Sequence, residues 1–173
     1  MNRYDPPLIL QRADPCILLS EDGYYYFTAT VPAFDLIELR RARSIEELAA
    51  ARPKVVWRRH EDGPMSRYIW APELHRIDGK WMIYFAAAQA EPYEHGVFDH
   101  RIYALANDAQ NPMEGRFEEC GQIQTGMESF SLDATSFSSG GQRYFVWAQR
   151  DYAIPGNSNL YICLLYTSPS PRD

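Results

Sequence analysis

One pattern recurs three times along this chain, and it constrains the fold more than any other feature. Each copy has a short segment, a glycine-containing turn and a second segment rich in aromatic residues; the copies begin at Ala13, Trp70 and Leu132. The interval of about 60 residues falls in or just above the range expected for the blades of a β-propeller and other radial arrays. Two copies carry an aspartate at the same point, Asp14 and Asp133. Because equivalent strands of all blades line one central channel, we expect these two side chains to converge on one pocket.

Other segments also predict β-strands, because they are rich in β-branched and aromatic residues and are bounded by Gly, Pro, Asp or Asn. The predicted strands are residues 24–30, 36–40, 55–58, 80–87, 101–106 and 143–148. Residues 44–51 predict a short helix, with Ser44 as its cap and Glu47 completing a capping box. Residues 88–100 predict a polar loop over one face of the disc, and residues 107–115 a turn between outer strands.

These segments divide into blades. The first is predicted from about residue 7 to 59 and the second from about 66 to 119, while the third begins near Ser129. A propeller needs four or more blades to close. We therefore predict an all-β fold in which the chain holds about two and a half blades of a larger disc.

Composition excludes several classes of partner. With 46% hydrophobic residues, the chain is able to form a sizeable core. The net charge is −6 and the basic residues are scattered, which argues against nucleic acid. No apolar run suggests a membrane partner, and the first six residues lack the apolar region of a signal peptide, so a cytoplasmic location is expected. The cysteines and histidines show no metal-ligand spacing, so no metal site is predicted.

The last residues look foreign to the rest. Residues 163–173 read Cys-Leu-Leu-Tyr-Thr-Ser-Pro-Ser-Pro-Arg-Asp, which matches, codon for codon, one reading frame of the adapter used in transposase-based sequencing libraries. The third repeat also breaks off at Ile162, within a strand. We therefore expect residues 1–162 to be the N-terminal part of a longer protein and residues 163–173 not to be native. The alternative is an ordinary Pro/Ser-rich tail.

Three short motifs follow one another at blade spacing. Residues 13–15 read Ala-Asp-Pro, residues 70–73 read Trp-Ala-Pro-Glu and residues 131–135 read Ser-Leu-Asp-Ala-Thr. Together with residues 25–42 and 154–162, they resemble glycoside hydrolase family 43, in particular the branch of exo-α-1,5-L-arabinofuranosidases. The resemblance implies a five-bladed β-propeller that inverts configuration while releasing terminal α-L-arabinofuranosyl residues from arabinan or arabino-oligosaccharides. Residues 1–162 would then be a truncated catalytic domain.

Inverting hydrolysis of a glycosidic bond needs a carboxylate that activates water and a carboxylic acid that protonates the leaving oxygen, roughly 6.5–9.5 Å apart. Asp14 suits the general base, since it lies at the channel end of an inner strand and precedes a proline that fixes the chain. The resemblance gives Asp133 the role of raising the pKa of the acid by like-charge repulsion. In the family, the acid is a Glu of the fourth blade, and no residue of this chain takes its place. The chain alone is therefore expected to be inactive.

Trp70 is predicted to form an apolar platform for the sugar ring, and Phe34 a wall of the pocket. Glu73 is expected to support a loop or bind backbone and not to act in catalysis. No cofactor is required for this chemistry, although the resemblance allows a calcium ion in the central channel of the full-length protein. The expected partner is an arabinose-containing oligosaccharide or polysaccharide.

Other interpretations remain open. Asp14 is also suited to cap a turn before Pro15, Asp133 to end a strand, and Trp70 to fill the core. A second interpretation keeps the fold but changes the substrate, so that the protein would be a β-xylosidase or an endo-arabinanase. A non-catalytic carbohydrate-binding propeller is the third interpretation, and it would need one of the carboxylates to be missing.

Overall fold

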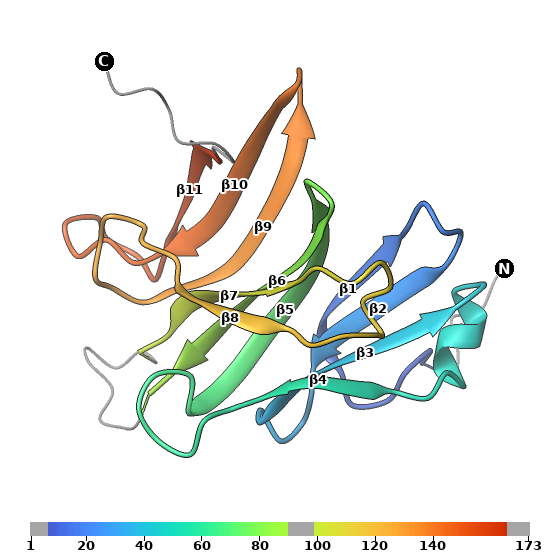
Figure 1. The fold of residues 1–173 in the computed structure, drawn as a ribbon. Helices are drawn as coiled ribbons and strands as arrows, with labels where there is room; N and C mark the ends of the chain where they lie inside the picture. The colour runs from blue at the N-terminus through green and yellow to red at the C-terminus, as the bar shows by residue number, and fades with distance from the viewer. Residues whose placement is uncertain (1–6, 90–98, 166–173) are drawn as a thin grey trace, which may run out of the picture.

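A computed structural model describes residues 7–89 and 99–165 of the chain, which form three antiparallel β-sheets (Figure 1). The first sheet contains β1 (Ala13–Leu19), β2 (Tyr25–Thr30), β3 (Leu36–Ala42) and β4 (Lys54–Arg58). The second contains β5 (Arg67–Ile77), β6 (Lys80–Ala88), β7 (Arg101–Asn107) and β8 (Glu118–Gln122). The third contains β9 (Ser131–Ser139), β10 (Gln142–Gln149) and β11 (Asn159–Leu164).

Every strand pairs with the next one along the chain, which is the meander of a propeller blade. We call the three sheets the first, second and third blades. Their first strands, β1, β5 and β9, are the inner strands: β5 packs against both β1 and β9. The predicted all-β fold and the predicted order of blades are confirmed.

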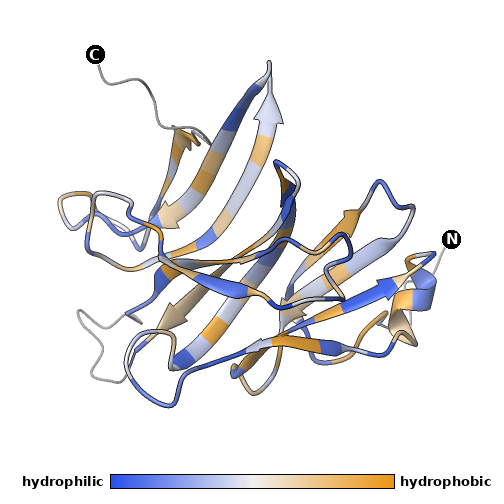
Figure 2. Cartoon of the chain, in the orientation of Figure 1, coloured by the Kyte–Doolittle hydropathy of each residue, from blue (hydrophilic) through white to orange (hydrophobic). Residues whose placement is uncertain are grey.

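The core lies between the blades. In β6, Ile83 and Phe85 belong to a buried cluster shared with the first blade, whereas Tyr84 belongs to a cluster shared with the third. Because the middle blade is buried on both faces, β6 is apolar at nearly every position and does not alternate with polar residues (Figure 2). A smaller cluster around Leu48 covers part of the outer face of the first blade.

The expected helix over residues 44–51 is wrong in type and length. The structure has one turn of 3₁₀-helix, η1 (Glu46–Ala49). The local signals that suggested a helix are present: the backbone N–H of Glu47 donates to Ser44 Oγ, and the N–H of Arg43 donates to the Glu47 carboxylate. A single turn is enough to bury Leu48 in the connection between β3 and β4, so the helix does not extend.

Two loop predictions have different outcomes. The turn predicted at residues 107–115 does connect β7 and β8, where Asn107 accepts from the N–H of Ala109 and donates to the carbonyl of Glu114. Most of the loop predicted at residues 88–100 lies outside the described residues. Strand β8 was not predicted at all.

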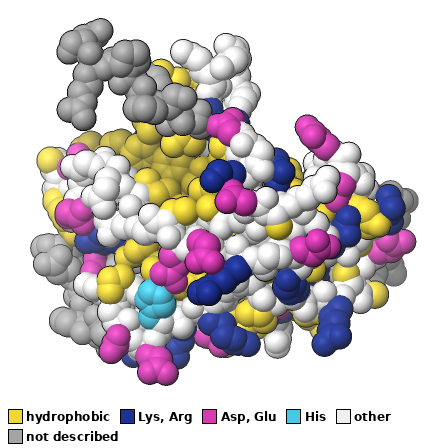
Figure 3. All heavy atoms as spheres, viewed as in Figure 1, with side chains coloured by type: hydrophobic (Ala, Val, Ile, Leu, Met, Phe, Trp, Pro, Cys, Tyr) yellow, Lys and Arg dark blue, Asp and Glu magenta, His cyan; other side chains and the backbone are white. Residues whose placement is uncertain are grey.

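Charges of both signs are mixed on the surface, as expected from the scattered basic residues of the sequence. On the face shown in Figure 3, Lys and Arg side chains are interspersed with Asp and Glu, and hydrophobic side chains gather in one hollow. Among residues 7–89 and 99–165, no helix is long and apolar enough to cross a membrane.

Candidate active site

The three inner strands share one distortion. Two residues of each inner strand oppose a single residue of the neighbouring strand, which makes a β-bulge at Asp14–Pro15, at Ala71–Pro72 and at Asp133–Ala134. The first residue of each bulge has a left-handed backbone, with φ of 51° at Asp14, 46° at Ala71 and 53° at Asp133. This conformation is uncommon for residues other than glycine, and such strain clusters at functional sites. The repeat in the sequence therefore corresponds to a repeated bulge.

The structure brings Asp14 and Asp133 together, although they lie in different blades. Burial raises the pKa of Asp133, and the negative charges of Asp14 and Glu73 raise it further. Charges that influence one another in this way occupy one site at the inner edge of the blades.

Asp14 is held by a buried threonine. The hydroxyl of Thr30 donates to Asp14 Oδ2 at 2.8 Å and accepts from the backbone N–H of Ala71, also at 2.8 Å. Thr30 comes from β2 and Ala71 from β5, so the carboxylate of the first blade is linked to the bulge of the second. Sequence reasoning missed Thr30, because nothing in residues 25–30 distinguishes it from any other strand residue.

Glu73 lies closer to the carboxylates than the sequence suggested. Among the described residues, the groups that bind its carboxylate are side chains and not backbone: His75 Nε2 lies 3.1 Å from Glu73 Oε2, and Thr135 also forms a hydrogen bond with Glu73. Burial acts to raise the pKa of Glu73, but the hydrogen bonds from His75 and Thr135 outweigh it and lower the pKa. Since Thr135 follows Asp133 by two residues on β9, Glu73 connects the second blade to the strand that carries Asp133. Its place two residues after Ala71, the counterpart of Asp14 and Asp133, is the sequence signal that could have placed it beside them.

Trp70 and Phe34 belong to one aromatic cluster beside Asp14. Trp70 stacks on His100, with ring centroids 4.1 Å apart and planes at 23°, and meets Phe34 edge-on at 6.0 Å. Tyr68 completes the cluster at 6.1 Å from Trp70. Phe34 is 37% exposed and lines a hollow with Ala13 and Thr30, next to Asp14. Phe34 thus lies beside the strand that carries the candidate base, and Trp70 precedes Ala71, whose N–H binds the same Thr30 that holds Asp14.

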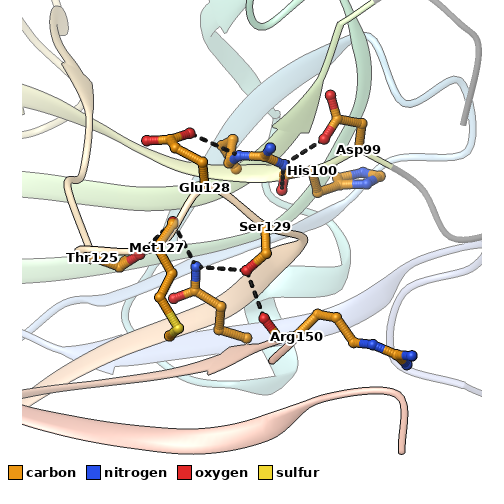
Figure 4. A network of polar contacts seen from close by, with 9 residues as sticks. Asp99, His100, Thr125, Met127, Glu128, Ser129 and Arg150 are labelled. Carbon is orange, nitrogen blue, oxygen red and sulfur yellow. Dashed lines mark hydrogen bonds and ion pairs between the residues drawn. The ribbon is translucent and has the colours of Figure 1, made fainter. Parts of the chain in front are cut away.

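The segment leading into β9 is fixed by polar contacts around His100 and Ser129 (Figure 4). Gln149 Nε2 donates to the carbonyl of Met127 at 2.9 Å and to Ser129 Oγ at 3.1 Å, while Ser129 Oγ donates to the carbonyl of Arg150 at 2.6 Å. These bonds anchor the chain shortly before Asp133 and so help to set where the bulge of the third blade begins.

Throughout the described parts of the chain, no group of three or more His, Cys, Asp or Glu side chains is placed to hold a metal ion.

Comparison with known proteins places this geometry in a family. The sequence profile of glycosyl hydrolases family 43 matches residues 4–168. The crystal structure of an α-L-arabinofuranosidase from Lactobacillus brevis is 53% identical with a TM-score of 0.90, over 94% of this chain and 51% of that one. An extracellular exo-α-(1→5)-L-arabinofuranosidase from Streptomyces chartreusis is 50% identical over 159 residues, which are 92% of this chain and 47% of that protein. The chain spans about half the length of these relatives.

The expected cytoplasmic location is wrong. Two relatives at 50% and 49% identity, from Streptomyces chartreusis and Streptomyces avermitilis, are described as extracellular. A targeting segment, and not the folded domain, decides where a protein resides, so the composition of the first six residues was a poor basis for that expectation.

The solved structures that this chain resembles also share its architecture. They are five-bladed β-propellers, and the first two blades and the three-stranded third blade of this chain superimpose on about half of such a disc. Together with the profile match over residues 4–168, this similarity shows that the chain belongs to glycosyl hydrolases family 43.

Proposed function

We propose that residues 1–162 are the N-terminal part of an inverting glycoside hydrolase that releases terminal α-L-arabinofuranosyl residues from arabinan or arabino-oligosaccharides. The observation that carries the proposal is the convergence of Asp14 and Asp133 on equivalent bulges of two inner strands. The names of the relatives at 53% and 50% identity support the choice of sugar.

In the proposed reaction, Asp14 accepts a proton from a water molecule as the water oxygen bonds to the anomeric carbon. The bond from that carbon to the leaving oxygen breaks at the same time, and a carboxylic acid outside the described residues protonates the leaving oxygen. Water attacks the face opposite the leaving group, so the configuration inverts. Because the acid is not supplied here, the chain alone is expected to be inactive.

Asp133 contributes charge and not proton transfer. A carboxylate beside the acid disfavours the ionised form of that acid and so keeps it protonated when the substrate arrives. Trp70 and Phe34 offer an apolar wall to the sugar ring, whose C–H groups pack well on aromatic faces. Among residues 7–89 and 99–165, no group of three or more His, Cys, Asp or Glu side chains is placed to hold the calcium ion that the family resemblance allows, and no step of the proposed reaction depends on it.

Other substrates have weaker support. An endo-arabinase from Bacteroides thetaiotaomicron is only 15% identical, with a TM-score of 0.64, and this similarity shows the fold alone. A non-catalytic propeller would not need two carboxylates on strained bulges, and both are present.

The test begins with the source DNA, sequenced across the Ile162 codon. If the frame continues without residues 163–173, those residues are foreign and the complete protein is available for assay. It should release arabinose from 4-nitrophenyl α-L-arabinofuranoside and from arabino-oligosaccharides, and proton NMR should show the inverted anomer first.

Asp14→Asn is the matched variant, since the amide oxygen still accepts the Thr30 hydrogen bond. It should lower kcat about 10²–10⁴-fold, the usual contribution of general acid–base catalysis. A complete protein without arabinofuranosidase activity, or one that retains the anomeric configuration, would overturn the proposal.

A further inference from the structure

The bulge of the second blade carries no carboxylate. Ala71 stands where the first and third blades have Asp14 and Asp133, yet it adopts the same left-handed backbone, with φ of 46°. This conformation is unfavourable for alanine, so the surrounding structure must impose it. Because the methyl group of Ala71 has no polar atom, only the backbone of this bulge is able to form hydrogen bonds.

The bulge releases one backbone donor. In the pairing of β5 with β6, Trp70 lies opposite Ala86 and Glu73 opposite Tyr84, so Ala71 falls between the paired positions. Its N–H points to the first blade and donates to Thr30 Oγ1 at 2.8 Å. Thr30 is only 4% exposed, and water therefore does not compete for this bond.

The direction of the hydrogen-bond chain is fixed by its two ends. A backbone N–H is able only to donate, so Thr30 Oγ1 is the acceptor of the bond from Ala71. An ionised carboxylate is able only to accept, so the hydroxyl proton of Thr30 points to Asp14 Oδ2, 2.8 Å away. Within the described residues, Asp14 Oδ1 receives no hydrogen bond, and because Asp14 is exposed, Oδ1 is available to bind water.

We propose that Thr30, oriented by the N–H of the Ala71 bulge, is a positioning residue for Asp14: it holds Oδ2 so that Oδ1 is presented to the attacking water. The proposal rests on the function proposed above, in which Asp14 is the general base. Thr30 itself lies behind the carboxylate and acts only through it. The alanine bulge of the second blade thereby supports the carboxylate of the first.

Thr28 provides a matched control. It lies two residues earlier on β2, is completely buried, and its hydroxyl has no hydrogen-bond partner among the residues that the structure describes. Thr28→Val and Thr30→Val therefore make the same chemical change in the same strand, but only the second removes a contact to Asp14.

The experiment compares Thr30→Val, Thr30→Ser and Thr28→Val in the complete protein, with 4-nitrophenyl α-L-arabinofuranoside as substrate. Thr30→Val should lower kcat about 10–100-fold, part of what a general base contributes, with KM changed less than about threefold. Thr30→Ser keeps the hydroxyl and should stay within about threefold of the wild type. Thr28→Val should leave both constants unchanged. If Thr30→Val does not fold, Thr30→Ala removes the same hydroxyl without adding bulk.

A double-mutant cycle separates positioning from general damage. In the Asp14→Asn background, Thr30→Val should cause no further loss of kcat, because the carboxylate that Thr30 orients is already gone. Additive losses, a Thr30→Ser variant as slow as Thr30→Val, or a fully active Thr30→Val would each overturn the inference. An inactive wild type would instead contradict the proposed function, so the two failures are distinguishable.

Discussion

We predict that the buried histidine stacked on Trp70 makes the stability of the protein depend on pH. His100 has no solvent-exposed surface, stacks on Trp70 at 4.1 Å and has its Nε2 3.0 Å from the carbonyl oxygen of Tyr68. Burial is the main reason that the pKa of His100 is lowered to about 4; the bond to Tyr68 and the nearby Asp99 oppose it only partly.

The size of the effect follows from the pKa values of the two states. An unfolded histidine has a pKa of 6.5, and the gap down to about 4 corresponds to about 3 kcal/mol of unfolding free energy. Because the unfolded chain binds the proton first, this stability is fully present above pH 6.5. It is lost progressively as the pH falls from 6.5 to about 4.

The perturbation is His100→Gln, which removes the titrating ring and keeps an N–H able to reach the Tyr68 carbonyl. The assay is urea unfolding of wild type and variant at pH 7.5, 6.5, 5.5 and 4.5. The free-energy difference between the two proteins should shrink by about 2.5 kcal/mol over this range. As the pH falls, the histidine of the unfolded wild type gains a proton that the buried ring cannot bind, and the variant has no such group.

Ser129→Ala is the control, because it disturbs the neighbouring buried network without removing a titrating group. It should lower stability equally at every pH. If His100→Gln shows the same slope against pH as the wild type, the reasoning that links His100 to acid stability is refuted.

Two further predictions concern the carboxylates and the core. Glu73→Gln should bring the pKa of Asp133 down toward its ordinary value of 3.8, because one of the negative charges facing it is removed; ¹³C NMR titration measures this, and an unchanged pKa contradicts it. Ile83→Ala should cost about 4 kcal/mol of unfolding free energy and Leu48→Ala about 2 kcal/mol, as Ile83 lies in the large cluster between blades and Leu48 in a small outer one that is able to collapse. Equal losses in urea unfolding would contradict this reasoning.

The fold could be predicted because the inner hairpins carry their own local signals. Residues 24–30, 80–87 and 143–148 are apolar and aromatic, follow tight turns, and became β2, β6 and β10. Strand β8 could not be found in this way, since Glu118–Gln122 is polar and forms the outer edge of its blade. The short helix was overpredicted because the capping signals at Ser44 and Glu47 mark where a helix begins and not how far it continues.

The candidate site was only partly visible in the sequence, for a physical reason. Asp14 and Asp133 could be proposed because each is part of a repeated motif. Thr30 and Thr135 act through contacts between strands of different blades, and pairing at that distance along the chain leaves no local pattern. The same holds for His100, whose stacking on Trp70 brings β5 against the segment before β7.

The alanine in the second bulge now has an electrostatic explanation. Burial raises the pKa of Asp133, and the negative charges of Asp14 and Glu73 raise it further, so ionisation of Asp133 already works against both neighbouring charges. A carboxylate at position 71 would add a further charge among these three. Alanine avoids that repulsion, while the bulge it shares with the other blades still supplies a neutral N–H to Thr30. The bulge is therefore present in all three blades, because its backbone is used in each. The aspartate is not repeated at position 71, where its charge would be repelled by Asp14 and Asp133.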